Sequence, residues 1–171
     1  AIAHWDAQIS GKISLQLPYA LSLELASVCN LKCPQCPVGL GLIKRNRAFI
    51  DVSLATKLID EFAPHGFVLN LYFQGESLLH KDFGIIATHA VNKRLFTILS
   101  TNAHFLNQET ALSIVNSGLH RVIISIDGYN QNSYERYRAG GDVELAWRGL
   151  QLLVDARMKL HSGWPEILVQ T

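Results

Sequence analysis

Short apolar runs and stretches of helical periodicity alternate along most of the chain. The runs have the length and residue types of β-strands and comprise residues 21–26, 67–73, 95–99, 122–126 and 167–169. Between them, apolar residues recur every three or four positions, and Asp51, Asn107 and Asp142 stand where helix N-caps are expected. The long helices are expected after these caps and over 83–93, with a short one over 133–138. The pattern therefore predicts four strand–helix repeats and a fifth strand.

The predicted strands are mostly continuous apolar runs, as in a parallel sheet that is covered on both faces. Right-handed crossovers would place the carboxyl end of every strand at one edge, which is where such sheets bind ligands. Polar groups follow four successive strands at this edge: the segment 29–36, Gly75-Glu76, Thr101-Asn102 and Ser125 to Asp127. This convergence predicts a functional site built from four loops.

The first of these loops holds all three cysteines of the chain, Cys29, Cys33 and Cys36, spaced C-x3-C-x2-C. Three ligands are one short of a closed zinc site or of a cluster held by four cysteines. The spacing therefore favours an iron–sulfur cluster with one iron left open. Ordinary buried cysteines, a disulfide with one thiol left over, and a zinc site completed by His65 or His80 remain open as alternatives.

Composition changes this picture little. The 171 residues (19.0 kDa) are enough for about one domain, and 49% are hydrophobic, which is enough for a sizeable core. A net charge of +1 gives no electrostatic case for a nucleic-acid partner. We see no apolar run of the ~20 residues that a membrane span needs, and no signal peptide, so we expect no membrane partner and a cytoplasmic location. Residues 1–20 are interpreted as an N-terminal extension, with a short edge strand around Ile13, Leu15 and Leu17.

Four motifs at the predicted edge resemble those of a known family, the radical S-adenosylmethionine (radical SAM) superfamily. The cysteine loop resembles its cluster motif, and Gln74-Gly75-Glu76-Ser77 its Gly-Gly-Glu-Pro motif. Ser100-Thr101-Asn102-Ala103 is similar to its Thr-Asn-Gly turn, and Ser125-Ile126-Asp127-Gly128 to its fourth-strand motif. The resemblance covers residues 21–171 and is greatest to the branch of peptide and protein maturases, which often carry a C-terminal SPASM or twitch domain.

The resemblance implies an α/β fold, namely a partial (β/α)6 barrel of the triosephosphate-isomerase type with parallel strands, truncated after the fifth strand. It also implies that Cys29, Cys33 and Cys36 bind three irons of a [4Fe-4S] cluster, while S-adenosylmethionine (SAM) chelates the fourth. The reduced cluster would cleave SAM to a 5′-deoxyadenosyl radical, which abstracts hydrogen from the substrate. Because the barrel is incomplete, residues 21–171 are expected to be inactive alone.

The same resemblance suggests residues that bind SAM. Glu76 would accept hydrogen bonds from its ammonium group, and Gly75 would allow close backbone approach. Arg138 would pair with its carboxylate. Thr101, Asn102 and Ser125 would bind ribose or carboxylate oxygens. The sequence departs from the family pattern at Gln35, Gln74, Ser77 and Ala103, none of which is a cluster ligand.

Three functions follow as hypotheses. The first is a radical SAM enzyme that acts on a peptide or protein, and the second is a radical SAM enzyme that acts on a small metabolite. The third is a zinc-binding or scaffold module without catalysis. The two enzyme hypotheses need an electron donor of the flavodoxin or ferredoxin type. The basic residues Lys44, Arg45 and Arg47 are interpreted as a solvated charge run, with an acidic substrate as the alternative.

Overall fold

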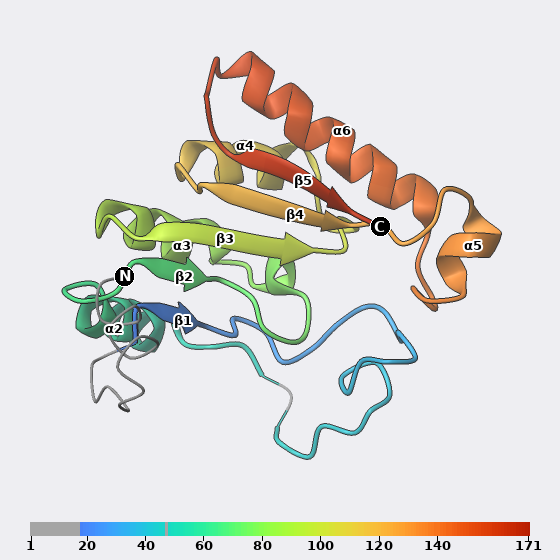
Figure 1. Cartoon of the computed structure of the whole chain (residues 1–171), viewed down its shortest axis with the longest axis horizontal. Helices are drawn as coiled ribbons and strands as arrows, with labels where there is room; N and C mark the ends of the chain where they lie inside the picture. Colours follow the sequence, from blue (N-terminus) through green and yellow to red (C-terminus); the bar gives the residue numbers. More distant parts are fainter. Residues whose placement is uncertain (1–17, 47) are drawn as a thin grey trace, which may run out of the picture.

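Five parallel strands form one sheet whose spatial order is the order of the chain, β1-β2-β3-β4-β5 (Figure 1). The computed structural model describes residues 18–46 and 48–171, so the strand predicted around residues 13–17, and Arg47, lie outside the described residues. The strands are β1 (Ala20–Ser22), β2 (Val68–Asn70), β3 (Phe96–Thr101), β4 (Arg121–Ser125) and β5 (Glu166–Gln170). The predicted α/β class and parallel strands are confirmed.

Helices occupy the crossovers, as the periodicity predicts. The elements are α2 (Val52–Phe62), the 3-10 turn η1 (Ser77–Leu79), α3 (Phe83–Asn92), α4 (Gln108–Asn116), α5 (Gln131–Glu135) and α6 (Val143–Lys159). Asp51 caps α2 through the N–H groups of Ser53 and Leu54, and Asn107 caps α4 through that of Thr110. Asp142 likewise caps α6. Successive long helices pack against one another along the outside of the sheet (Figure 1).

The sheet is fully covered on only one face, which differs from the prediction that both faces are covered. Along β3, buried Thr97, Leu99 and Thr101 alternate with half-buried Phe96, Ile98 and Ser100. Leu99 belongs to the apolar core, which also includes Leu69, Val122 and Ile124, and Thr97 and Thr101 are buried polar residues on the same side of β3. The apolar runs therefore include both the buried and the half-buried positions of a strand, although the half-buried face keeps partial access to solvent.

The first two strands are shorter than their apolar runs. Instead of spanning 21–26, β1 ends at Ser22; the N–H of Leu23 still donates to the carbonyl of Asn70 (2.8 Å). The chain then leaves the ladder, and Ala26 forms an isolated antiparallel bridge with Phe49. Likewise β2 ends at Asn70 rather than at 73, and the N–H of Leu71 makes its last bond toward β3, to the carbonyl of Ile98 (2.8 Å). Both strands end early because the chain turns to build the loops at the carboxyl edge.

Among the helices in the described part of the chain, none combines the length and apolar character that crossing a membrane requires.

Candidate functional site

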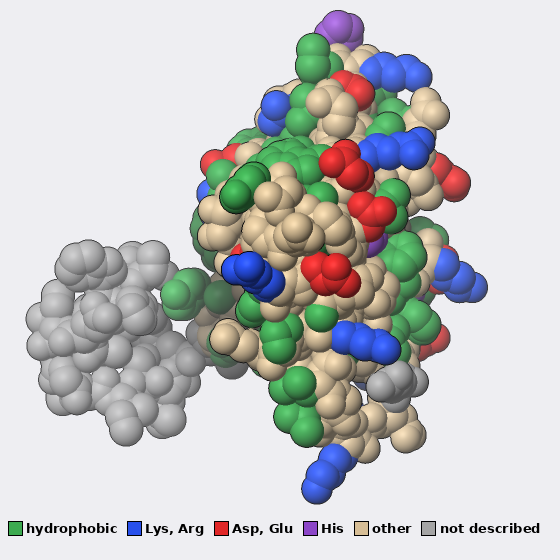
Figure 2. Space-filling model, turned by 90° about the vertical axis from the view of Figure 1, so that its right-hand side faces the viewer, with side chains coloured by type: hydrophobic (Ala, Val, Ile, Leu, Met, Phe, Trp, Pro, Cys, Tyr) green, Lys and Arg blue, Asp and Glu red, His purple; other side chains and the backbone are tan. Residues whose placement is uncertain are grey.

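A pocket of about 220 Å³ lies at the carboxyl ends of the strands. All nine residues predicted from the sequence to bind metal or cofactor line it: Cys29, Cys33, Cys36, Gly75, Glu76, Thr101, Asn102, Ser125 and Arg138. Figure 2 looks onto this edge of the molecule, where acidic and basic side chains are interspersed with apolar ones. The four loops that follow β1 to β4 therefore meet in one place.

The cysteine loop folds back on itself and is anchored to a distant segment. The N–H of Cys36 donates to the carbonyl of Cys33 (3.1 Å), and the N–H of Lys32 donates to the carbonyl of Ala139 (2.8 Å). A Cβ at Gly39 would lie 2.6 Å from both the N and the O of Cys33, so only glycine fits there. These contacts fix the loop without a helix or strand.

The three thiols are free and lie in an environment that opposes their ionisation. The pKa of Cys29 is raised to about 11, mainly by burial and to a lesser extent by the charges of Glu76, Cys33 and Cys36, while a hydrogen bond from the N–H of Leu31 opposes the shift. Burial also raises the pKa of Cys33, although Arg138 opposes this shift. A positively charged metal centre would reverse this balance, because thiolate ligands give up their protons on binding metal.

The donor set fits a cluster that takes three protein ligands. Three free cysteines line one small pocket. In the described residues, no three Cys, His, Asp or Glu side chains converge closely enough to chelate a single metal ion. His80 has both ring nitrogens engaged, by the carbonyl of Ile50 and the N–H of Asp82, and neither it nor His65 is among the residues that line the pocket.

Gly75 brings the turn after β2 against the cysteine loop. Its φ is +76°, and a Cβ on it would lie 2.2 Å from the carbonyl oxygen of Ala26 and 2.7 Å from that of Val28. The adjacent N–H of Glu76 donates to the carbonyl of Val28 (2.8 Å). Any side chain at residue 75 would separate the two loops, so this glycine is required by close approach and by its backbone conformation.

Glu76 connects the turns after β2 and β3. Its side chain is buried, and its carboxylate accepts hydrogen bonds from the N–H of Leu78 (3.0 Å), the hydroxyl of Thr101 (2.8 Å) and the N–H of Asn102 (2.9 Å). Burial raises its pKa, and these three hydrogen bonds oppose the shift. The carboxylate is thus engaged by the protein itself, a role the sequence did not indicate.

The turn after β3 contacts the cysteine loop through Asn102. Its side-chain amide donates to the Oδ1 of Asn30 (2.9 Å) and lies 3.8 Å from the sulfur of Cys29. Ala103, which stands where the family has glycine, has a φ of +68°. This left-handed conformation explains why glycine suits the position.

Arg138 is held by a carboxylate and acts on the cysteine loop through its charge. Its Nε donates to the Oδ2 of Asp127 (2.5 Å), and its positive charge opposes the rise in the pKa of Cys33. Asp127 was noted in the sequence only as part of a motif, and this pairing was not predicted. The lining residues to which the sequence motifs give no binding role are Leu31, Tyr72, Phe73, Gln74, Ser100 and Tyr137. Most of them flank the predicted motifs, so sequence proximity was the available signal.

Of the basic residues after the cysteines, Arg45 forms an ion pair with Glu24 (2.5 Å). Lys44 is not among the residues that line the pocket.

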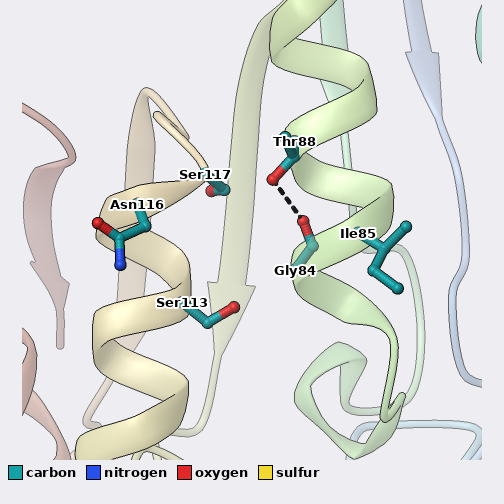
Figure 3. A pocket seen from close by; sticks show the side chains of 6 residues that line it. All are labelled: Gly84, Ile85, Thr88, Ser113, Asn116 and Ser117. Atoms are coloured by element: carbon teal, nitrogen blue, oxygen red, sulfur yellow. Dashed lines mark hydrogen bonds between the residues drawn. The ribbon is translucent and has the colours of Figure 1, made fainter.

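A second hollow, of about 470 Å³, lies between α3 and α4 (Figure 3). Its lining side chains are small or uncharged, and the hydroxyl of Thr88 is bonded to the carbonyl of Gly84 (2.8 Å). It lies among the outer helices and contains none of the predicted site residues. The pocket at the carboxyl edge is therefore the candidate site.

Comparison with known proteins agrees with this geometry. A family model described as "Radical SAM superfamily" matches residues 23–165. A PqqA peptide cyclase from Rhodopseudomonas palustris is 32% identical over 153 residues, which are 85% of this chain and 40% of that protein. An AdoMet-dependent heme synthase from Methanosarcina barkeri is 28% identical over 137 residues, covering 80% of this chain and 39% of that protein.

The fold is shared with a solved structure, that of BtrN in complex with AdoMet and 2-DOIA. The TM-score is 0.66 with 21% identity, and the match covers 91% of this chain and 58% of that one. The chain spans about two fifths of the length of the two curated relatives that it matches.

Proposed function

Because the chain belongs to the radical SAM superfamily, we propose that it is the core of an enzyme that uses a [4Fe-4S] cluster and SAM to modify a peptide or protein. The observation that carries this proposal is the single pocket that gathers three free cysteines and six SAM-binding candidates from four loops. When bound, these cofactors supply the one-electron cleavage of the S–C5′ bond of SAM and a carbon radical that abstracts hydrogen from the substrate.

In this proposal, Cys29, Cys33 and Cys36 hold the cluster and leave one iron for SAM. The loop contacts of Gly39 and Asn102 keep the three thiolates on one side of the pocket. The chain must also exclude water from this pocket, which the burial of the lining residues Leu31 and Cys33 favours.

The remaining polar residues orient SAM. Gly75 allows the backbone to approach the ligand, and Glu76, with the carbonyl groups beside it, provides acceptors for the ammonium group. Arg138 and Ser125 donate to the carboxylate, and Thr101 and Asn102 serve the ribose oxygens. Since the carboxylate of Glu76 already accepts three hydrogen bonds, its main contribution is to hold the turns that present these groups.

A peptide or protein substrate is favoured by the peptide cyclase relative, which is 32% identical. The heme synthase relative favours the second candidate, a small-molecule substrate. A reduced flavodoxin or ferredoxin is the proposed electron donor for either.

The test is anaerobic reconstitution of the full-length protein with iron and sulfide, followed by electron paramagnetic resonance of the reduced protein with and without SAM. We expect a [4Fe-4S]⁺ signal that changes when SAM is added. Cys36→Ala should lose the signal, whereas Ser113→Ala, in the hollow between α3 and α4, should keep it. Incubation with SAM and the peptides or metabolites of a cell extract, followed by mass spectrometry, then separates the two substrate classes.

A colourless protein that binds one zinc and has no affinity for SAM would overturn the proposal in favour of the zinc-binding module. A cluster whose electron paramagnetic resonance signal does not change when SAM is added would overturn the catalytic role. The cluster would then be a redox or structural centre.

A further inference from the structure

His104 joins the turn after β3 to the start of α6 through both nitrogens of its ring. Its Nε2 accepts a hydrogen bond from the backbone N–H of Asp142 (2.9 Å), which is the N-cap of α6. Its Nδ1 lies 3.0 Å from the carbonyl oxygen of Asn102. Because Nε2 accepts from an N–H, the proton of the neutral ring is on Nδ1, which donates to that carbonyl. A single tautomer therefore satisfies both contacts.

His104 also orients the side chain of Asn102. The backbone N–H of His104 donates to the Oδ1 of Asn102 (3.1 Å), which leaves the amide nitrogen to donate to the Oδ1 of Asn30 (2.9 Å). Asn102 is buried, and its own N–H donates to the carboxylate of Glu76 (2.9 Å). All four polar groups of Asn102 thus have partners, and His104 supplies two of them.

The contacts between His104 and Asn102 close the turn around Ala103. Its φ of +68° is a left-handed conformation, which costs free energy in residues other than glycine. The local contacts alone tie His104 only to its own turn. The bond to Asp142 is the one that connects this turn to another element of the fold.

The start of α6 is a firm support for such a bond. The N–H of Asp142 immediately precedes a helix of 17 residues, Val143–Lys159, which packs against α4. On the α5 side, the side chain of Gln131 donates to the carbonyl of Gly141 (2.9 Å) and accepts from the N–H of Val143 (3.0 Å). The amide that His104 contacts is therefore held by its neighbours on both sides.

We propose that His104 is a positioning residue for SAM binding, which uses the start of α6 to hold Asn102 in the orientation that the ligand requires. This inference rests on the proposed function, which gives Asn102 a contact with SAM. Asn102 lines the pocket, whereas His104 is not among its lining residues. His104 therefore acts through Asn102, and it strengthens binding because a side chain that is already oriented loses less freedom when the ligand arrives.

Two substitutions separate the contacts of His104. In His104→Asn, the shorter side chain places its amide near the position of Nδ1, where it can still donate to the carbonyl of Asn102 but does not reach Asp142. In His104→Gln, the longer side chain places its oxygen near the position of Nε2, where it can accept from the N–H of Asp142. The first variant therefore keeps the local contact, and the second keeps the contact with α6.

The experiment is equilibrium dialysis of SAM against the reconstituted full-length protein under anaerobic conditions. The dissociation constant should rise about three- to tenfold in His104→Asn, the equivalent of one net hydrogen bond, and at most about twofold in His104→Gln. The iron content should equal that of the wild type in both. The matched control is His89→Asn, which removes the contact of His89 with Asp60 (2.8 Å) between α3 and α2. This control should leave SAM binding unchanged.

Hydrogen exchange provides a second readout in the protein without cofactors. The N–H of Asn102 reports on the turn, because it is bonded to Glu76. Its exchange should be faster in His104→Asn and close to the wild type in His104→Gln, with no change in the core of β3 and α6. Faster exchange throughout β3 and α6 would show a general loss of stability and would overturn the positioning role.

Wild-type SAM affinity in His104→Asn, or an equal loss of affinity in His104→Asn and His104→Gln, would also overturn the inference. If these variants still bind a cluster that responds to SAM, the proposed function stands and only the inference fails. If the wild type binds no SAM, the proposed function and the inference fail together.

Discussion

Single residues fix the geometry of the site, and Glu76 illustrates how. Glu76→Gln would place an amide donor against either the N–H of Asn102 or the donors of Leu78 and Thr101. We expect the free energy of unfolding to fall by about 2–3 kcal/mol, the range for a lost hydrogen bond to a charged group and a buried donor left unpaired. Urea denaturation measures this, with the exposed Glu61→Gln as the control. Equal free energies of unfolding for Glu76→Gln and Glu61→Gln would contradict the inference that the Glu76 carboxylate holds the two turns together.

His120 gives the protein a pH dependence that can be measured. Burial lowers its pKa below the usual 6.5, and its Nδ1 accepts from the N–H of Thr97 (3.2 Å). Since the unfolded chain binds the proton more readily than the folded one, the stability that this residue contributes is complete above pH 6.5 and is lost as the pH falls below it. The difference in unfolding free energy between wild type and His120→Gln should therefore shrink from pH 7 to pH 5. Parallel curves for the two proteins would exclude this explanation.

At the residue scale, the site residues that could be predicted from the sequence are those that belong to a recognisable motif. Nine residues with recognisable spacing line one pocket, and their binding roles stay predictions. The hydrogen bonds of Glu76 and the pairing of Asp127 with Arg138 were not predicted. The first depend on how the loops after β2 and β3 meet, and the second depends on how the segment after β4 folds back on itself, and no local pattern encodes either distance.

At the scale of elements, Gly149 sets how closely α6 approaches the turn after β3. A Cβ there would lie 2.4 Å from the carbonyl oxygen of Ala103. Gly149→Ala should gain about 1 kcal/mol of helix propensity and lose about 1–3 kcal/mol through overpacking. We expect a net loss of up to about 2 kcal/mol and weaker SAM binding, because Asn102 precedes the displaced residue.

Thermal unfolding and SAM titration measure both effects of Gly149→Ala. The neighbouring Arg148→Ala is the control, since its side chain is exposed on the same helix. If Gly149→Ala is more stable than the wild type, the turn after β3 can move away from α6 without a cost in packing.

Helices were predicted more accurately than strands. Their caps and apolar stripes are local signals, and α2, α4 and α6 begin at the residues after Asp51, Asn107 and Asp142. The apolar runs around β1 and β2 extend beyond the paired residues, because Leu25 and Leu71 are buried outside the strands. An apolar run marks buried positions, and in β1 and β2 these positions extend beyond the last residue that pairs with the neighbouring strand.

For the whole molecule, stability should be unevenly distributed. The described residues between β1 and α2 form turns and one isolated bridge, while the sheet and helices carry most of the core. Cluster binding should stabilise this loop selectively, because its ligands lie there. We expect amide hydrogen exchange within residues 29–42 to slow at least tenfold on reconstitution, with little change in β3 and α6. Uniform protection across the chain would instead indicate that the cluster stabilises the fold as a whole.

The fold class was predicted from alternating elements, and the barrel character from the resemblance. The sequential strand order and the likeness to a solved structure at a TM-score of 0.66 agree with both. Closure of a barrel depends on what pairs with β5, which local patterns in residues 1–171 do not encode.

The sequential strand order also has a consequence for biosynthesis. Each strand pairs with the one made before it, so the sheet can grow strand by strand as the chain leaves the ribosome. The cysteine loop is synthesised early, yet it is anchored to Asn102 and Ala139, which emerge much later. The thiols therefore spend part of synthesis without their final neighbours, and metal delivery is best timed after the α5 region has emerged, when Cys33 meets Arg138 and the pocket exists to receive iron.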